Sequence, residues 1–387
     1  MTSYPNLTKN WCGVLSAAML GLISVNAAHG QITTLANFNG LDIGEAASLT
    51  LSGNTFYGTT TVGNLGNGSV FSVPVDGGTP TTLVNFNGTD GSRPRDGVVI
   101  SGTMLYGITN YGGAYNQGTL YSAPIAGGAP TTLIDFDPSN SVGTLPVGGL
   151  TLAGNTLYGT TGAAGDRGTL FSEPLTGGAP NVLATEVSSS SSLTLSGGIL
   201  YGAEQNNSIF SVPVTGGPVK VLATLPNGEL AAGTLTLSGN TLYGTSQAGG
   251  AYGYGTIFSV PVTGGIITTL ASFNGTNGEY PVGGVTVVGN MLYGTAQFGG
   301  ANDLGTIFSE PLTGGTPTDV ADFNFVNGDG PQSNLILIGN TLYGTTQEGG
   351  LQGGGTLFSF VVPEPSTWAL LLGGLGLLAF WRGRRGV

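Results

Sequence analysis

The 387-residue chain contains only one cysteine and one histidine, Cys12 and His29, and both lie in its first thirty residues. Those residues have the features of a removable export signal, described below, so we expect the mature protein to contain neither. Their absence excludes cysteine nucleophiles, Ser-His dyads, disulfides and His or Cys metal sites. We therefore expect no cofactor of these kinds, and only carboxylate chemistry stays open.

Charged residues are also scarce, at 7 % of the chain, and the formal net charge is −12. All the acidic residues except Glu364 lie between Gln31 and Val362, where the bases are only Arg93, Arg95, Arg167 and Lys220. A surface with so few bases is a poor match for phosphate backbones, which argues against nucleic acid as a partner. We interpret the negative charge as an aid to solubility.

Glycine and apolar residues are abundant, with 72 glycines and 40 % hydrophobic residues. This composition is too apolar for a disordered chain and too rich in turn formers for a helical one. It favours an all-β fold.

The N-terminus is typical of a secretory signal. One base, Lys9, precedes an apolar run over residues 11–25 and a stretch of small residues. Ala28 and Gly30 fit the −3 and −1 positions of a cleavage site, so we expect residues 1–30 to be a signal peptide that is removed near Gly30. A permanent membrane anchor is the alternative, but a full span needs about 20 apolar residues.

The C-terminus has the elements of a membrane tail. Residues 368–381 are apolar and uncharged, and Arg382, Arg384 and Arg385 follow as a basic stop on the cytoplasmic side. At about 1.5 Å per residue this stretch covers roughly two thirds of a hydrocarbon core about 30 Å thick, so it would be a weak permanent transmembrane anchor.

Pro363-Glu364-Pro365, followed by the short apolar stretch and the terminal arginines, resembles the PEP-CTERM sorting signal of Gram-negative bacteria. The resemblance assigns residues 363–387 to sorting and implies that an exosortase in the inner membrane recognises the motif and cleaves the tail. The protein would occupy the inner membrane transiently and then reach the cell surface or the extracellular space. Members of this family are commonly tied to exopolysaccharide or biofilm production, so exopolysaccharide or another envelope component is the expected partner.

Between the two ends a unit of 42–52 residues recurs seven times around a Tyr-Gly core. Its tyrosines are Tyr57, Tyr106, Tyr158, Tyr201, Tyr243, Tyr293 and Tyr343. The fifth copy shows four strand-like pieces separated by turn residues, over 235–239, 241–245, 255–262 and 268–273. Four-stranded units in this number predict a seven-bladed β-propeller over residues 31–362, with the recurring tyrosines packed between blades.

The two ends of the repeat region complement each other. The region begins with a fourth-strand sequence over residues 32–38, and its last unit stops after the third strand near Val362. We expect the first strand to complete the seventh blade and close the ring. The unit resembles the tandem GloVer-type repeats of exported bacterial proteins, and the fourth copy departs from them by its short loop over residues 203–207.

The long, variable connections between second and third strands, and between successive units, predict a ligand-binding face, because long loops on a rigid scaffold commonly carry function. Aromatic and amide side chains on this face suit sugars, through stacking and hydrogen bonds to hydroxyls. The candidate residues are Tyr111, Tyr115, Tyr252, Tyr254, Phe298, Gln247, Gln297 and Gln347. The alternative is that they are solvated loop residues without a ligand.

Acidic residues in the same loops leave two further possibilities open. Asp90, Asp137, Asp166 and Asp303 could bind calcium, but we favour Asx turns as the explanation for them. Paired carboxylates could instead make the protein a carbohydrate-active enzyme, but no pair stands out in the sequence. We therefore expect a non-enzymatic binding or structural protein.

Overall fold

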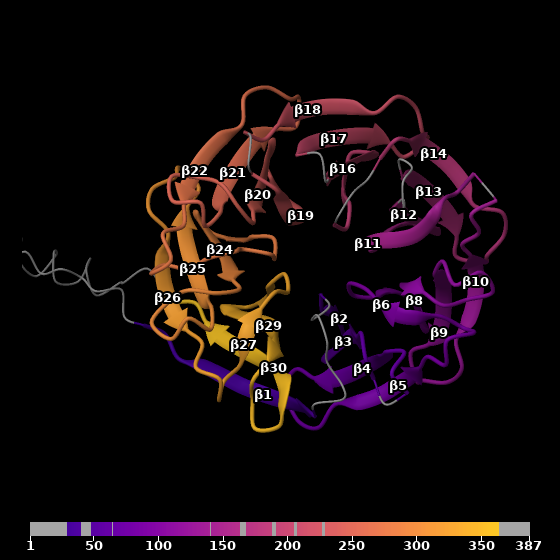
Figure 1. Ribbon diagram of the computed structural model, residues 1–387, viewed down its shortest axis with the longest axis horizontal. Helices are drawn as coiled ribbons and strands as arrows, with labels where there is room; N and C mark the ends of the chain where they lie inside the picture. Colours follow the sequence, from indigo (N-terminus) through magenta and orange to yellow (C-terminus); the bar gives the residue numbers. More distant parts are fainter. Residues whose placement is uncertain are drawn as a thin grey trace, which may run out of the picture.

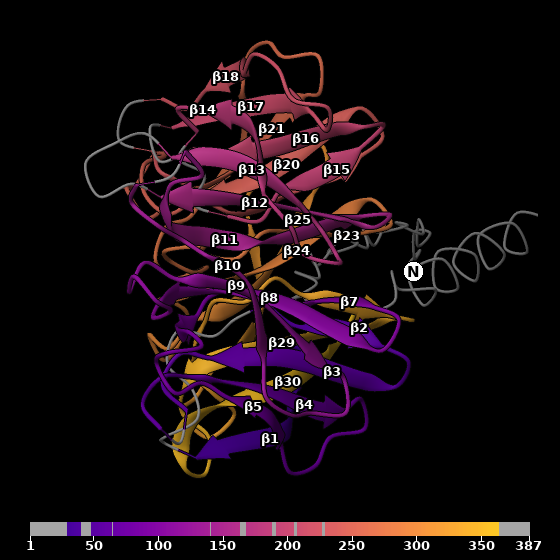
Figure 2. The same cartoon turned by 90° about the vertical axis from the view of Figure 1, so that its right-hand side faces the viewer.

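The computed structural model describes residues 29–39, 48–63, 65–139, 141–162, 168–187, 191–204, 207–226 and 229–363. Over these residues seven antiparallel sheets surround a central axis, which confirms the predicted all-β, seven-bladed propeller (Figure 1). Figure 2 shows the ring from its edge, with the strands running across its thickness. The described part of the chain has no helix long and apolar enough to cross a membrane.

The first three blades follow the chain outward from the axis. Blade 1 consists of β2 (Thr50–Ser52), β3 (Thr55–Thr60), β4 (Ser69–Pro74) and β5 (Thr81–Asn85). Blade 2 consists of β6 (Ser92–Pro94), β7 (Val99–Ser101), β8 (Met104–Tyr111), β9 (Thr119–Pro124) and β10 (Thr131–Asp135). Blade 3 consists of β11 (Thr144–Ala153), β12 (Thr156–Gly162), β13 (Thr169–Pro174) and β14 (Asn181–Thr185).

The next three blades repeat this order. Blade 4 consists of β15 (Thr194–Ser196), β16 (Ile199–Ala203), β17 (Ser208–Pro213) and β18 (Lys220–Thr224). Blade 5 consists of β19 (Ala231–Ser238), β20 (Thr241–Ser246), β21 (Thr256–Pro261) and β22 (Thr268–Ser272). Blade 6 consists of β23 (Thr286–Val288), β24 (Met291–Ala296), β25 (Thr306–Pro311) and β26 (Thr318–Asp322). The fourth copy thus keeps its four strands despite its shortened loop.

Blade 7 joins the two ends of the repeat region. It consists of β27 (Asp329–Pro331), β28 (Ile336–Ile338), β29 (Thr341–Glu348), β30 (Gly353–Val361) and, as its outermost strand, β1 (Ile32–Asn39). β1 runs antiparallel to β30, with Thr33 opposite Ser359. The predicted closure of the ring by the first strand is therefore confirmed.

The Tyr-Gly core has a steric explanation within each blade. In blade 5, Gly244 of the second strand lies opposite Phe258 of the third. A Cβ atom at Gly244 would lie 2.6 Å from the end of the Phe258 ring, so only glycine leaves room for it. The same glycine lies against an aromatic ring in all seven blades, and the ring is Phe except in blade 2, where it is Tyr121.

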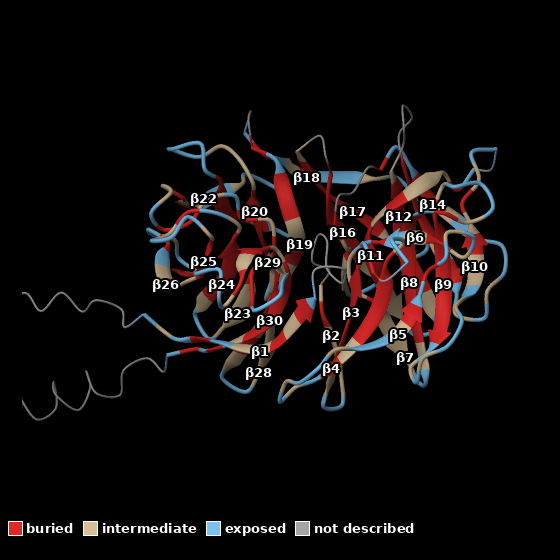
Figure 3. Cartoon of the chain, turned by 60° about the horizontal axis from the view of Figure 1, so that its bottom comes forward, coloured by how far each residue is buried: buried red, intermediate tan, exposed pale blue. Residues whose placement is uncertain are grey.

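Aromatic contacts then join neighbouring blades. Phe38 of β1 packs edge-on against Phe71 of blade 1, with ring centroids 4.8 Å apart. Equivalent edge-on pairs join four further junctions: Phe86–Tyr121, Phe136–Phe171, Phe273–Phe308 and Phe323–Phe358. The recurring tyrosines pack in the same clusters, as Tyr57 does against Leu105 of the next blade. The predicted packing of the tyrosines between blades is confirmed. Figure 3 shows the buried residues along the strands.

Threonines on the innermost strands of five blades add hydrogen bonds to the next blade. Thr151 of blade 3 donates its hydroxyl proton to the Leu193 carbonyl of blade 4, and Thr286 of blade 6 donates to Leu335 of blade 7, each over 2.6 Å. Thr50, Thr194 and Thr236 make the same bond to their next blades. The innermost strands are therefore held in register with each other at the wall of the central channel.

Candidate functional site

A cavity of about 550 Å³ lies on the propeller axis. Every blade contributes to its wall, mostly through residues just before or at the start of the innermost strand. In a blade of four antiparallel strands, that end of the first strand faces the same side as the connections between units and the loops between second and third strands. The axial cavity thus belongs to the loop face that the sequence predicts as the ligand face.

Glycines allow the blades to approach one another at this cavity. Gly148 of β11 and Gly233 of β19 both line it and have φ of 70° and 64°. A Cβ atom at Gly148 would lie 2.5 Å from the Ser191 backbone, and one at Gly233 would lie 2.3 Å from the Gly284 nitrogen. Glycine is required here both by its conformation and by the close approach of the next blade.

The cavity wall is rich in hydrogen-bonding groups and poor in charge. Its polar side chains include Arg95, Asp96, Thr234, Gln247, Gln332 and Asn334. The Asp96 carboxylate accepts a hydrogen bond from the Ser192 hydroxyl, and the Asn334 amide donates to the Thr234 hydroxyl over 3.2 Å. Such a wall offers donors and acceptors to a neutral, hydroxyl-rich molecule.

Exposed aromatic residues gather on the loop face at the junction of blades 5 and 6. Tyr254, Tyr280 and Phe298 are 37 %, 39 % and 41 % exposed. The Tyr280 and Phe298 rings are 6.2 Å apart and meet edge-on, and the Tyr280 amide donates to the Tyr254 carbonyl over 3.1 Å. We call these three residues the aromatic shelf. Val282, two residues after Tyr280, lines the cavity, so the chain runs from the shelf into the cavity wall.

The sequence prediction included Tyr254 and Phe298 but missed Tyr280. Tyr280 has φ of 55°, a conformation that costs energy for a residue with a side chain, and it precedes Pro281. Pro281 packs against the preceding blade, where a Cβ atom at Gly255 would lie 2.7 Å from its ring. Arg93 and Leu145 have the same conformation before Pro94 and Pro146. The dipeptide of Tyr and Pro at the start of a blade was the signal that could have identified Tyr280.

The structure places two of the other predicted aromatic residues in a different blade from the shelf. Tyr111 lies in blade 2, where the Arg93 guanidinium stands 5.7 Å from its ring centroid. Tyr115 belongs to the same blade, and it and Tyr252 of blade 5 are exposed. The predicted residues therefore do not form one continuous surface.

The three predicted glutamines are half-buried and approach the cavity to different extents. Gln247 lines it directly. Gln347 accepts a hydrogen bond from the cavity residue Gln332 over 2.8 Å. The main-chain N–H of Gln297 donates a hydrogen bond to the Tyr280 carbonyl over 3.0 Å, which links Gln297 to the shelf.

The loop carboxylates considered for calcium accept hydrogen bonds within their own loops. Asp90 accepts from the Asn87 amide, Asp137 from the Ser139 amide and Asp303 from the Gly299 amide, over 2.8–3.1 Å. These bonds are the Asx-type contacts that stabilise tight turns. Asp166 lies outside the described residues.

A second group of acidic residues was not singled out in the sequence. Burial, followed by the charge of Asp303, raises the pKa of Glu279, the residue before Tyr280. Burial, followed by the charges of Glu348 and Asp303, raises the pKa of Asp329. These carboxylates come from the loops of blades 6 and 7, so sequence spacing could not bring them together.

The sorting residues lie at the edge of the described chain. Pro363 follows β30 and is exposed. Glu364, Pro365, Arg382, Arg384 and Arg385 lie outside the described residues, as does the predicted signal peptide up to residue 28.

Comparisons with known proteins identify both parts of the chain. The sequence profile of the Gloeobacter/Verrucomicrobia repeat matches residues 20–207 and 201–371, and that of the PEP-CTERM protein-sorting motif matches residues 361–385. A search of curated proteins finds no match.

Two solved structures are similar in fold. An oligogalacturonate lyase in complex with manganese matches at 13 % identity and a TM-score of 0.57, over 87 % of this chain and 94 % of its own. The computationally designed Ika8 protein matches at 14 % identity and a TM-score of 0.50, over 85 % of this chain and 99 % of its own. At these identities the likeness shows the propeller fold alone.

Proposed function

Because the chain belongs to the Gloeobacter/Verrucomicrobia repeat family and ends in a PEP-CTERM sorting motif, we propose that it is a surface or matrix protein whose propeller binds extracellular polysaccharide without transforming it. The motif implies an exported protein that an exosortase recognises at the membrane. The propeller is the part that would act after this processing.

The observation that carries this proposal is that the aromatic shelf and the polar axial cavity share one face of the propeller. The face of a pyranose ring is apolar and stacks on Tyr or Phe, while its hydroxyls need amide and hydroxyl partners. Tyr280 and Phe298 supply the first kind of contact, and Gln247 and Gln332 supply the second. Both kinds of group therefore lie on one face of the same rigid scaffold.

The charge of the site favours a neutral polysaccharide over an anionic one. Arg95 and Asp96 are the charged residues of the cavity wall, and they have opposite signs. The acidic residues Glu279 and Asp303 lie near the shelf and would repel a polyanion. We therefore expect neutral hexose polymers to bind more tightly than uronic acid polymers.

Binding of the surface-released protein to neutral and acidic oligosaccharides, followed by calorimetry, tests this. Tyr280→Ala and Phe298→Ala should each weaken binding about five- to tenfold, because losing one stacking contact removes about 1–1.5 kcal/mol. Ile266→Ala is the matched control, because Ile266 is 89 % exposed in a turn on the opposite face. Equal affinity in all three variants would contradict the assignment of the shelf.

The competing function is a carbohydrate-active enzyme that uses the carboxylates beside the shelf. A raised pKa at Glu279 is a property that general acids share. Product analysis after prolonged incubation with bound oligosaccharides separates the two functions. Saccharide cleavage that Glu279→Gln abolishes would establish the enzyme and overturn the binding-only proposal.

A further inference from the structure

The residues just before β1 are docked on blade 6. The Gly30 amide donates a hydrogen bond to the Val320 carbonyl of β26 over 2.8 Å. A Cβ atom at Gly30 would lie 2.3 Å from the Phe360 ring of β30, so a residue with a side chain would clash with this ring. This segment therefore has a defined place at the junction of blades 6 and 7.

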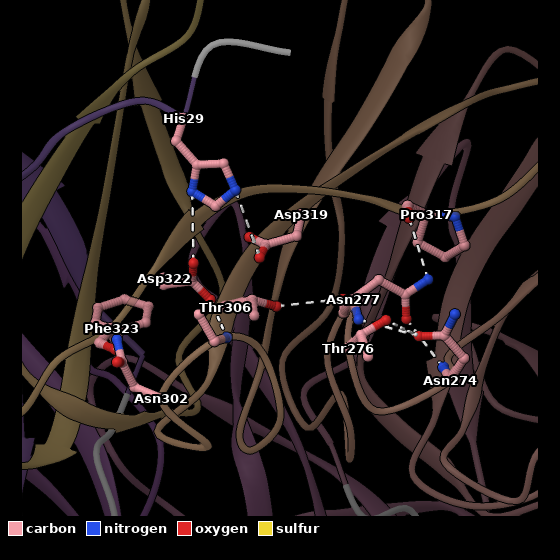
Figure 4. A network of polar contacts seen from close by, with 11 residues as sticks. His29, Asn274, Thr276, Asn277, Asn302, Thr306, Pro317, Asp319, Asp322 and Phe323 are labelled. Carbon is pink, nitrogen blue, oxygen red and sulfur yellow. Dashed lines mark hydrogen bonds and ion pairs between the residues drawn. The ribbon is translucent and has the colours of Figure 1, made fainter. Parts of the chain in front are cut away.

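His29, the single histidine of the chain, lies at the same place beside two carboxylates of β26 (Figure 4). Its Nδ1 atom is 3.5 Å from Asp322 Oδ2, and its Nε2 atom is 3.8 Å from Asp319 Oδ2. One ligand atom from each of the three side chains can be chosen so that all lie within 4.8 Å of one another. The imidazole is 53 % exposed, which leaves it open to solvent, while the two carboxylates are largely buried.

We propose that His29 stays in the mature protein and, together with Asp319 and Asp322, forms a binding site for a divalent transition-metal ion such as Zn²⁺. One imidazole nitrogen and two carboxylate oxygens are a ligand set that Zn²⁺ accepts, with water in the remaining position. Tetrahedral Zn²⁺ with ligands at about 2.0–2.2 Å requires them roughly 3.4 Å apart. Rotation of the exposed imidazole would aim one nitrogen between the two carboxylates.

The surroundings of the carboxylates favour a cation. Asp319 Oδ1 is buried and makes no hydrogen bond among the described residues. Asp322 Oδ1 is held in place by the Ala301 amide, which donates to it over 2.7 Å. Both carboxylates lie within 4 Å of the same imidazole and are largely buried, so a bound cation would offset the repulsion between their like charges.

Retention of His29 requires a signal cleavage site upstream of the one predicted near Gly30. Ala27 and Ala28 directly precede His29 and are also small, so cleavage after either of them fits a signal peptidase. Cleavage there would leave the docked residues on the protein. The ion would then join the start of the mature chain to β26 of blade 6, next to the strand that closes the ring.

The first experiment is the intact mass and N-terminal sequence of the exported protein. A mature chain that begins at Ala28 or His29 supports the proposal. A chain that begins at Gln31 overturns it, because the imidazole ligand would then be missing.

The second experiment measures Zn²⁺ binding to the same protein by calorimetry and by NMR with labelled histidine. Because the chain has one histidine, the imidazole signals are unambiguous, and we expect them to shift at one Zn²⁺ per protein. His29→Ala should abolish binding, and Asp319→Asn and Asp322→Asn should each weaken it at least tenfold. Asp76→Asn is the matched control, because it removes the same charge from an exposed turn.

Thermal unfolding separates a metal site from a simple ion pair. Zn²⁺ should raise the melting temperature of the unaltered protein and of Asp76→Asn, and chelation should reverse the gain. An unaltered protein that keeps His29 but shows no stoichiometric Zn²⁺ binding overturns the proposal. Equal binding by His29→Ala also overturns it.

Discussion

Glu310 is an unusual residue in the interior of this propeller. It lies opposite Leu292 in β25, is fully buried, and neither carboxylate oxygen has a hydrogen-bond partner among the described residues. Five other blades have an apolar residue at this position: Val73, Ala123, Val212, Val260 and Phe360. Only blade 3 shares the feature, with Glu173. Burial raises the pKa of Glu310 from 4.5 to about 7.

We predict that Glu310→Val stabilises the protein at neutral pH and reduces its pH dependence. Because the folded-state pKa of Glu310 is raised, the folded protein holds this proton more tightly than the unfolded chain. Its contribution to stability is fully present below pH 4.5 and is lost as the pH rises through about 7. This loss amounts to about 3 kcal/mol, which the valine variant would not show. Melting temperatures measured from pH 4.5 to 8 for both proteins test it.

Glu310→Gln is the control, because it removes the titration while keeping the polar group buried. It should flatten the pH profile as the valine does but should not raise stability as far, since its amide would lack partners. Parallel pH profiles for all three proteins would show that Glu310 does not titrate in this range.

At the scale of elements, the ring is closed by hydrogen bonds between β1 and β30 rather than by a covalent link. Thr33 and Ser359 face each other across this pair although they are far apart in the sequence. We predict that Thr33→Cys with Ser359→Cys forms a disulfide in the exported protein. A crosslink over so long a loop should stabilise the fold by about 4–5 kcal/mol. Thermal unfolding with and without reductant measures this gain.

Thr34→Cys with Ser359→Cys is the register control for the crosslink. Neighbouring residues in a strand point to opposite faces, so this second pair should not join. If the control pair formed a disulfide and the Thr33 pair did not, the register of β1 on β30 would be wrong.

At the scale of the whole molecule, the repeated units made the fold predictable. The fifth copy predicted strands over 235–239, 241–245, 255–262 and 268–273, and the structure has β19 to β22 at these places. The lone first strand also predicted closure. Repetition supports such inferences because seven copies must satisfy one packing arrangement, in which Gly244 and its six counterparts make room for an aromatic ring.

The features that differ between blades were less predictable. Tyr280 is displayed on the loop face because Pro281 and Gly255 hold the backbone in a rare conformation, which a pattern of strands does not show. The axial cavity combines residues from all seven blades. The place of His29 was missed because the sequence assigned it to the removed signal.

The tail gives the last prediction, which concerns the route of the complete chain. If an exosortase cleaves at the sorting motif, the surface-released protein should lack residues 368–387, because the apolar stretch and its arginines would stay in the membrane. Intact mass spectrometry measures this loss.

Replacement of Pro363, Glu364 and Pro365 by alanine should leave a full-length protein in the membrane fraction. The same three substitutions leave the described propeller up to Val362 unchanged, so a failure to fold would not explain retention. A released protein that still carried Trp368 to Val387 would show that the motif does not direct cleavage.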